Sequence, residues 1–223
     1  MAMKEREFHP AALAAASNND LSALKAILAA KEPLGRDAQG RTLLCFCALF
    51  AQPETLALLL SAKTHAKDAA ADGQTPLMRA ALNPDAASVR ALLPASDPKA
   101  TDARGVSALM LAAMAGNPAA VEMLLPHSDA RAEDHAGRTA FDYAAGAAYV
   151  QDDEQSGPCR AERECVELLA GHASIEQKEL AISRLGEALL PLLCSALEAD
   201  VLRREVRSSA HLGQKKARGT HAL

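Results

Sequence analysis

The sequence predicts an all-α protein built from stacked pairs of antiparallel helices. Alanine accounts for 51 of the 223 residues, and alanine is the best helix-forming residue. Aromatic residues make up only 3% of the chain, whereas β-sandwiches and barrels are enriched in β-branched and aromatic residues. A third observation is a short motif that returns at intervals of 32 or 33 residues. Small alanine-rich helices and a fixed period together favour a repeat architecture over a single large core.

The repeated motif starts with a glycine, and Thr or Ser follows two residues later. The four Thr/Ser residues are separated by 33, 32 and 32 residues; they are Thr42, Thr75, Ser107 and Thr139. The glycine permits the positive φ that a tight turn needs, and the hydroxyl can cap the helix that follows. Five residues after each hydroxyl lies a pair of small residues, which lets neighbouring helices approach closely. Each period therefore predicts a turn and a capped first helix.

The second helix of each period is predicted by an apolar stripe. In three periods a leucine pair lies three residues after Leu56, Val89 or Val121, which is the spacing of one helix face. Pro94 and Pro126 follow two of these pairs directly and should stop the helix, because proline cannot continue one. One such unit cannot bury its own apolar face, so several units must stack into a continuous core.

The pattern resembles the ankyrin repeat, which has a period of about 33 residues and a Thr-Pro-Leu-His-x-Ala signature. The resemblance covers roughly residues 8–173. Only the repeat that starts near Ala70 carries Thr-Pro-Leu intact. The signature histidine is replaced in every repeat; the residues at its position are Cys45, Met78, Met110 and Asp142. What carries the resemblance is the in-phase recurrence of four copies, and it implies a solenoid of antiparallel helix pairs joined by hairpin loops.

The chain is accordingly expected to form one ankyrin-type domain over residues 8–173, with about five repeats. Their bounds are 8–36 (degenerate, a cap), 37–69, 70–101, 102–133 and 134–173. The last repeat should carry an insert near residues 149–161, because Val166 lies 27 residues after Thr139 instead of 14. Its second helix should be closed by Gly171. Residues 174–207 have leucines at helical spacing and are predicted as a C-terminal helical cap; residues 208–223 are predicted to be disordered.

Composition excludes several classes of function. The net charge of −4 argues against nucleic acid as a partner. The longest apolar runs are about half of the ~18 residues that span a bilayer, so no membrane insertion is expected. Five cysteines without a regular spacing indicate a reduced, intracellular and cytoplasmic protein. Cys45 and Cys47 are two residues apart and should point to different sides of a helix, so no metal is expected. No catalytic or cofactor motif is present, and the chain is predicted not to be an enzyme.

The resemblance implies another protein as the partner of a monomeric chain. In ankyrin-type proteins the partner usually lies on the concave side, against the hairpin tips and the inner helices. By position, the partner-binding candidates are Phe46, Leu49, Phe50, Arg79, Asn83, Arg104, Met114, Arg138 and Tyr143. Val106 and Leu111 also fall on this side. Exposed aromatic residues and arginines are the usual interface anchors. Alternatively, Phe46 and Phe50 only cover a groove beside the small first repeat.

Two functions stay open at this stage. The first is a non-enzymatic interaction module with an adaptor, inhibitor or toxin-neutralising role. The second is an effector or enzyme that the repeats target, with its activity in residues 174–223, although no catalytic arrangement is visible there. The insert also has two interpretations. It is either a passive loop or a negative patch, formed by Asp152, Asp153 and Glu154, that suits a basic partner surface.

Overall fold

The computed structural model describes residues 9–31, 33–50, 53–62, 68–150, 160–175 and 177–178, with only the backbone for residues 148–150. Within these ranges the regular structure consists of ten α-helices and two short 3₁₀ helices. The extended pairing seen there is limited to two isolated bridges, Arg36 with Thr42 and Thr101 with Ser107. The predicted all-α class is confirmed.

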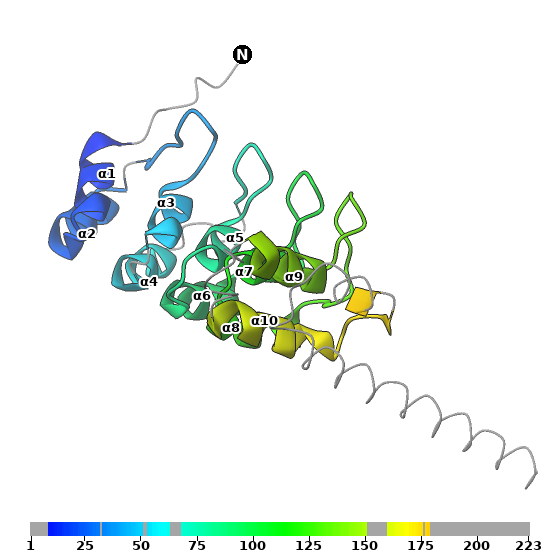
Figure 1. Ribbon diagram of the computed structural model, residues 1–223. Coiled ribbons are helices and arrows are strands. Elements are labelled where there is room, and N and C mark those ends of the chain that lie inside the picture. The colour runs from blue at the N-terminus through cyan, green and yellow to red at the C-terminus, as the bar shows by residue number, and fades with distance from the viewer. Residues whose placement is uncertain are drawn as a thin grey trace, which may run out of the picture.

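The helices form two parallel rows in a single stack (Figure 1). The inner row consists of α1 (Pro10–Ser17), α3 (Leu43–Leu49), α5 (Pro76–Ala81), α7 (Ala108–Met114) and α9 (Ala140–Val150). The outer row consists of α2 (Leu21–Ala29), α4 (Pro53–Ser61), α6 (Ala87–Leu92), α8 (Pro118–Leu124) and α10 (Arg160–Ala170). Each helix contacts its partner in the other row and its neighbours in its own row. The chain therefore rises through the stack one helix pair at a time.

A hairpin loop precedes each of the helices α3, α5, α7 and α9, and the loops project from one side of the stack (Figure 1). Adjacent hairpins are joined by backbone hydrogen bonds. The N–H groups of Ala71, Ala103 and His135 donate to the carbonyls of Gln39, Asp72 and Arg104 at 3.0, 3.1 and 2.9 Å. The hairpins thus form a ladder with one bond at each step, in addition to the packing of the helices.

The inner helices begin as the sequence predicts. The hydroxyls of Thr42, Thr75 and Ser107 each accept a hydrogen bond at 3.3 Å from the amide three residues ahead. In the repeats of Thr75 and Ser107, the methionine at the position of the signature histidine completes the cap. The Sδ atoms of Met78 and Met110 accept hydrogen bonds from the N–H groups of Thr75 and Ser107 at 3.5 and 3.4 Å.

The fifth repeat closes its cap with a carboxylate instead of a sulfur. Asp142 Oδ2 accepts hydrogen bonds from both the N–H and the hydroxyl of Thr139, each at 2.8 Å.

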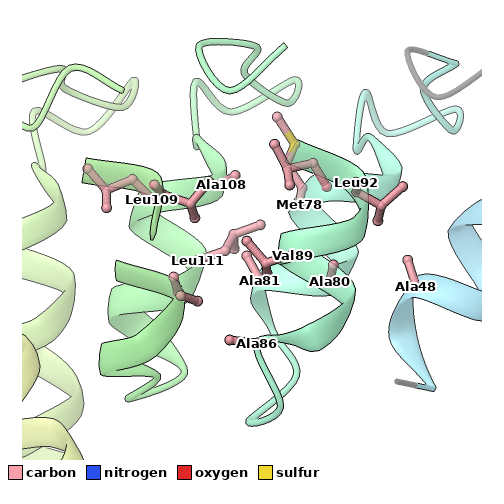
Figure 2. Packing of buried hydrophobic residues seen from close by; sticks show 14 of the residues in the cluster. Ala48, Met78, Ala80, Ala81, Ala86, Val89, Leu92, Ala108, Leu109 and Leu111 are labelled. Carbon is pink, nitrogen blue, oxygen red and sulfur yellow. The ribbon is translucent and has the colours of Figure 1, made fainter. Parts of the chain in front are cut away.

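The core lies between the two helix rows and between neighbouring repeats (Figure 2). Alanines at the small-pair positions, such as Ala80, Ala81 and Ala112, are completely buried, and Cys47 occupies the same position in its repeat. The outer helices contribute the predicted stripe of fully buried aliphatic residues, namely Leu56, Leu59, Val89, Leu92, Val121, Leu124, Val166 and Leu169. The small inner residues let the larger outer ones fill the space between repeats.

The ends of the outer helices also follow the sequence. Helices α6 and α8 stop at Leu92 and Leu124, and a 3₁₀ turn that contains the proline follows each of them, over Leu93–Ala95 and Leu125–His127. Helix α10 ends at Ala170. Gly171 comes next, as expected, but it does not have the positive φ of a glycine cap.

The predicted insert and C-terminal regions fall largely outside the described residues. The two ends of the expected insert at 149–161 belong to helices α9 and α10, and residues 151–159 between them lie outside the described ranges. Of the predicted cap at 174–207, residues 174, 175, 177 and 178 are described, and the predicted tail at 208–223 is not.

A new capped turn starts at Ser174, beside the first turn of α9. The Ser174 N–H donates to Gln177 Oε1 at 2.8 Å, and the Gln177 N–H donates to Ser174 Oγ at 3.1 Å, which is a reciprocal capping box. Gln177 Nε2 also donates to Thr139 Oγ1 and to Asp142 Oδ2, both at 3.1 Å. Ser174 lies five residues after Leu169, whereas Thr139 lies fifteen residues after the equivalent Leu124. The capped turn at Ser174 therefore follows α10 without a hairpin between them.

Candidate partner-binding surface

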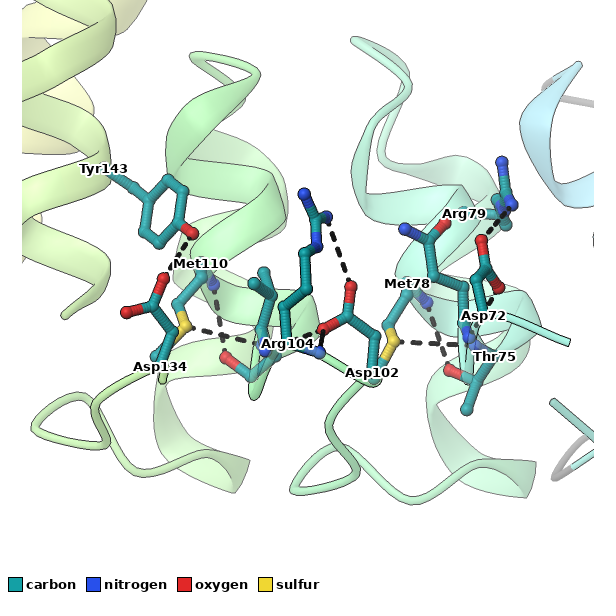
Figure 3. Close-up of polar contacts among 12 residues, drawn as sticks. Asp72, Thr75, Met78, Arg79, Asp102, Arg104, Met110, Asp134 and Tyr143 are labelled. Carbon is teal, nitrogen blue, oxygen red and sulfur yellow. Dashed lines mark hydrogen bonds and ion pairs between the residues drawn. The ribbon is translucent and has the colours of Figure 1, made fainter. Parts of the chain in front are cut away.

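The hairpins and the inner helices together form the surface on which the sequence places the binding residues. We call the ion-paired side chains of the hairpins and inner helices, together with Tyr143, the palm row. They are Asp37, Arg41, Asp72, Arg79, Asp102, Arg104, Asp134, Arg138 and Tyr143. Figure 3 shows the Tyr143 hydroxyl directed at Asp134 and the Arg104 guanidinium beside Asp102.

Each of three hairpins is organised by an aspartate five residues before the cap residue. Asp102 Oδ1 accepts the N–H groups of Arg104 and Val106 at 2.8 and 2.9 Å. Asp134 Oδ1 accepts the N–H groups of Ala136 and Arg138, both at 2.9 Å, and Asp37 accepts two in the same way. Sequence reasoning missed these residues, although the alignment of the four motifs carries Asp at this position in three of them.

The second oxygen of each aspartate faces an arginine of the same hairpin. Arg104 Nη2 lies 3.2 Å from Asp102 Oδ2, and Arg138 Nη2 lies 2.7 Å from Asp134 Oδ2. The side chain of Arg104 is 68% exposed and that of Asp102 is 2% exposed; for Arg138 and Asp134 the values are 53% and 1%. Arg41 pairs with Asp37 in the same sense. In these hairpins the carboxylate is inside and the guanidinium is outside.

Tyr143 completes the most elaborate of these clusters. Its hydroxyl donates to Asp134 Oδ2 at 2.7 Å and accepts from Arg138 Nη2 at 2.7 Å, while the guanidinium lies 4.6 Å from the ring centroid. Burial acts to raise the pKa of Asp134, but the hydrogen bonds from Arg138 and Tyr143 outweigh it and hold that pKa well below its ordinary value. Burial and the bond to Asp134 raise the pKa of Tyr143. At neutral pH Asp134 and Arg138 are therefore charged, and the Tyr143 hydroxyl keeps its proton.

The hairpin that starts at Ala70 differs from the other three because it has no aspartate at the organising position. Asp72 accepts from the Gln74 N–H at 3.0 Å and from Arg79 Nη2 at 3.1 Å. Here the polarity is reversed, since the Asp72 side chain is 51% exposed and the Arg79 side chain only 17%. Arg79 Nε and Gln74 Oε1 are buried without a hydrogen-bond partner. The Arg79 side chain thus packs mainly within its own repeat and is only slightly exposed.

The ends of the inner helices contribute exposed apolar side chains. Phe50 is 54% exposed and Met114 is 44% exposed, and they are the large hydrophobic residues that the described part of the chain leaves open to solvent. The rings of Phe46 and Phe50 are tilted by 47° with their centroids 4.6 Å apart. Phe46 also packs against the core, so it lies between the core and the exposed ring of Phe50.

Other candidates have structural roles. Asn83 Nδ2 donates to the Leu49 carbonyl at 2.9 Å, and Asn117 Nδ2 donates to the Asn83 carbonyl at 2.5 Å. Asn83 and Leu49 therefore join consecutive repeats. Val106 and Leu111 do not lie on the surface as expected, because they are 1% and 2% exposed. At this position of the hairpin, an arginine can keep its charged end in water. The apolar Val106 side chain instead gains free energy by burial.

Cys45, Cys47 and Cys165 are buried. Burial raises the pKa of Cys45 and raises that of Cys47 to about 12, so neither thiol ionises readily. Within the described ranges there is no group of three His, Cys, Asp or Glu side chains that could hold a metal ion. No helix in these ranges is long and apolar enough to cross a membrane. The proposed alternative site in residues 174–223 lies outside the described residues except at four positions.

Comparison with known proteins agrees with this architecture. No curated protein shows significant similarity to the chain. A family model for ankyrin repeats, in three copies, matches residues 12–102 and 77–179. The two matches overlap and together span most of the helical stack described above. The chain therefore belongs to the ankyrin-repeat family.

Proposed function

We propose that the chain is a non-enzymatic module that binds another protein through the palm side of its stack, in an adaptor, inhibitor or toxin-neutralising role. Ankyrin repeats generally mediate protein–protein interaction. The observation that carries the proposal is the pair of exposed hydrophobic residues, Phe50 and Met114. Phe50 directly follows α3, and Met114 is the last residue of α7. Both helices belong to the inner row, as does α9, which carries Tyr143 of the palm row.

The chemistry of this surface suits a protein partner. Interfaces are enriched in aromatic residues, methionine and arginine, and a few such anchors supply most of the binding free energy. Complete burial of a Phe or Met side chain contributes roughly 1.5–3 kcal/mol. Arg104 and Arg138 add exposed charged hydrogen-bond donors on the hairpins that precede α7 and α9. A surface with apolar anchors and oriented charges favours recognition of a folded surface or of a defined peptide.

The test is a triple variant, Phe50→Ala with Met114→Ala and Arg104→Ala. None of the three side chains is buried, so helical content and melting temperature should stay close to those of the wild type. The bound protein is first identified by capture on the wild-type chain from the source cells and mass spectrometry. Its affinity for the triple variant should then fall by at least about 100-fold, which corresponds to loss of two strong anchors.

A second triple variant controls for the loss of surface residues. Arg90, Glu122 and Arg163 are exposed on the outer helices α6, α8 and α10. Replacing these three by Ala should leave the affinity unchanged. If the palm variant binds the same protein as tightly as the wild type and the outer-helix variant does not, the partner uses the outer face and the proposal is wrong.

A further inference from the structure

The palm row has a fixed order of exposed charges along the stack. Three hairpins place an arginine outside and its aspartate inside, at Arg41, Arg104 and Arg138. The hairpin between Arg41 and Arg104 places its acid outside, at Asp72. From the C-terminal end, the more exposed member of each palm-row ion pair therefore reads positive, positive, negative, positive.

The outward arginines are only partly compensated by their aspartates. Each inner carboxylate is also held by the hairpin backbone, because Oδ1 of Asp102 and of Asp134 accepts two backbone N–H groups. A guanidinium has five N–H donors. Among the described residues Arg104 donates one of them to Asp102. The Arg104 side chain is 68% exposed, so its other donors can receive a carboxylate of a partner.

The distance between successive charges sets the register of the partner. Packed helices lie about 8–10 Å apart, and the hairpins follow that spacing because each begins an inner helix and is bonded to the next hairpin. A chain in the extended polyproline II conformation advances about 3.1 Å for each residue and returns to the same face after three residues, so every third residue meets the next repeat. The hairpin tips carry exposed alanines, Ala38, Ala71, Ala103 and Ala136, and such small residues let an extended backbone approach the guanidiniums closely.

We propose that the palm row binds an extended, mainly acidic peptide segment in which every third residue faces one repeat. The order of the facing side chains is acidic, acidic, basic, acidic, opposite Arg138, Arg104, Asp72 and Arg41. This inference rests on the proposed function, because it names the chemistry of the segment that a palm-side partner presents. Unlike a general preference for acidic proteins, it specifies the spacing of the facing residues and one basic position among them.

The experiment uses labelled synthetic peptides and the full chain, with binding followed by fluorescence anisotropy. The first peptide has Glu, Glu, Lys and Glu in this order at every third position, separated by Ser and Pro. The second has the same composition with these residues at every second position, and the third carries them at every seventh position of an alanine-rich helix. The first peptide should bind at least about ten-fold more tightly than either of the others, and its affinity should fall as salt is added.

Two double variants separate the palm row from the total charge. Arg104→Gln with Arg138→Gln keeps an amide donor beside each aspartate and removes two positive charges from the palm row. Arg90→Gln with Arg163→Gln removes two positive charges from the exposed face of outer helices. The palm variant should bind the first peptide about five-fold more weakly for each charge removed, Arg104→Lys with Arg138→Lys should recover part of the loss, and the outer variant should bind like the wild type.

The outcomes decide between the two proposals. Equal binding of all three peptides, equal loss in both double variants, or no binding of the first peptide at about 1 mM overturns the inference. If a captured partner still depends on Phe50 and Met114 in that case, the proposed function stands and only the peptide register is wrong. If the partner does not depend on the palm side at all, the proposed function fails, whatever the peptides do.

Discussion

At the scale of single residues, the organising aspartates stabilise three of the four hairpins. Asp102 and Asp134 each satisfy two backbone N–H groups that a tight turn would otherwise leave without a partner. Both side chains are almost completely buried. A buried acceptor that loses its donors costs about 1–3 kcal/mol, so these carboxylates and their turns stabilise each other. The repeat at Ala70 lacks this arrangement.

Ala70→Asp should therefore stabilise the protein. Ala70 is buried at the same position of its hairpin as Asp102, and a carboxylate there can accept the hairpin N–H groups and approach the unpartnered Arg79 Nε. We expect the free energy of unfolding to rise by about 1 kcal/mol, measured by urea denaturation at neutral pH. Ala70→Asn, which has the same shape without the charge, should gain less. A loss of stability in both variants would show that this hairpin cannot accommodate the arrangement of the others.

The acid sensitivity of the protein should depend on the same carboxylates. The pKa of Asp134 is lowered in the folded state, because its hydrogen bonds outweigh its burial. Its contribution to stability is therefore present above the unfolded pKa of about 3.9 and is lost as the pH falls through that value toward the folded one. Asp134→Asn should destabilise the protein by about 1 kcal/mol at pH 7, and the difference from the wild type should shrink between about pH 5 and pH 3. Denaturation curves across this range measure it, and a difference independent of pH would contradict it.

At the scale of elements, the hairpin ladder makes glycine necessary for two separate reasons. Gly73 has a φ of +81°, and a Cβ there would lie 2.9 Å from the Ala103 nitrogen of the next hairpin. Gly137 has a φ of +73°, but a Cβ there would find only the Glu133 carboxylate, at 4.0 Å. The two positions share the backbone conformation that L-residues disfavour, and only the first also meets a neighbouring hairpin.

Comparison of Gly73→Ala with Gly137→Ala isolates the cost of separating two hairpins. Gly137→Ala should destabilise the protein by about 1–2 kcal/mol through the left-handed backbone alone. Gly73→Ala should cost more, because the bond from Ala103 to Asp72 must also lengthen or break. Amide hydrogen exchange at Ala103 should accelerate in Gly73→Ala, and that at His135 should stay unchanged. Equal costs for the two variants would mean that the hairpin bonds contribute little to the stack.

The elements themselves were largely predictable because they depend on local rules. A cap hydroxyl, a small pair and a leucine stripe each act within one turn or one helix face, and they recur in phase at Thr42, Thr75 and Ser107. The exposure of individual palm residues was not predictable by position. Arg79 pairs with Asp72, and Asn83 bonds to the previous repeat, because these partners are set by how neighbouring segments pack in three dimensions. The capping box at Ser174 and Gln177 is visible in the sequence as Ser-x-x-Gln and was missed.

At the scale of the whole molecule, the described residues after α10 contact the last repeat. Gln177 bonds to the first turn of α9 through Thr139 and Asp142, and the side chain of Lys178 is completely buried. We propose that residues 174–207 cap this end of the stack. In solenoids, terminal units that differ from the interior repeats are what keeps the apolar end of the stack from aggregating.

A chain that ends at residue 173 should consequently be less stable than the full chain. We expect a lower melting temperature and concentration-dependent association, because apolar area uncovered at the last repeat costs about 25 cal/mol for each Å². Differential scanning fluorimetry and sedimentation measure the two effects. Gln177→Ala in the full chain is the milder comparison, and it should lose only the stability of its hydrogen bonds, about 1 kcal/mol. A truncated chain that stays monomeric and equally stable would rule out the capping role.

The missing hairpin before Ser174 also limits how such a chain can change its length in evolution. Duplication of a repeat between residues 37 and 133 would create a copy whose hairpin both donates to its predecessor and accepts from its successor, as one hairpin does through the Ala71 N–H and the Asp72 carbonyl. A copy added after Ala173 would meet a unit that starts directly with its capped turn and has no hairpin to continue the ladder. Growth of the binding surface is therefore confined to the interior of the stack, and related chains with more repeats should have gained them there.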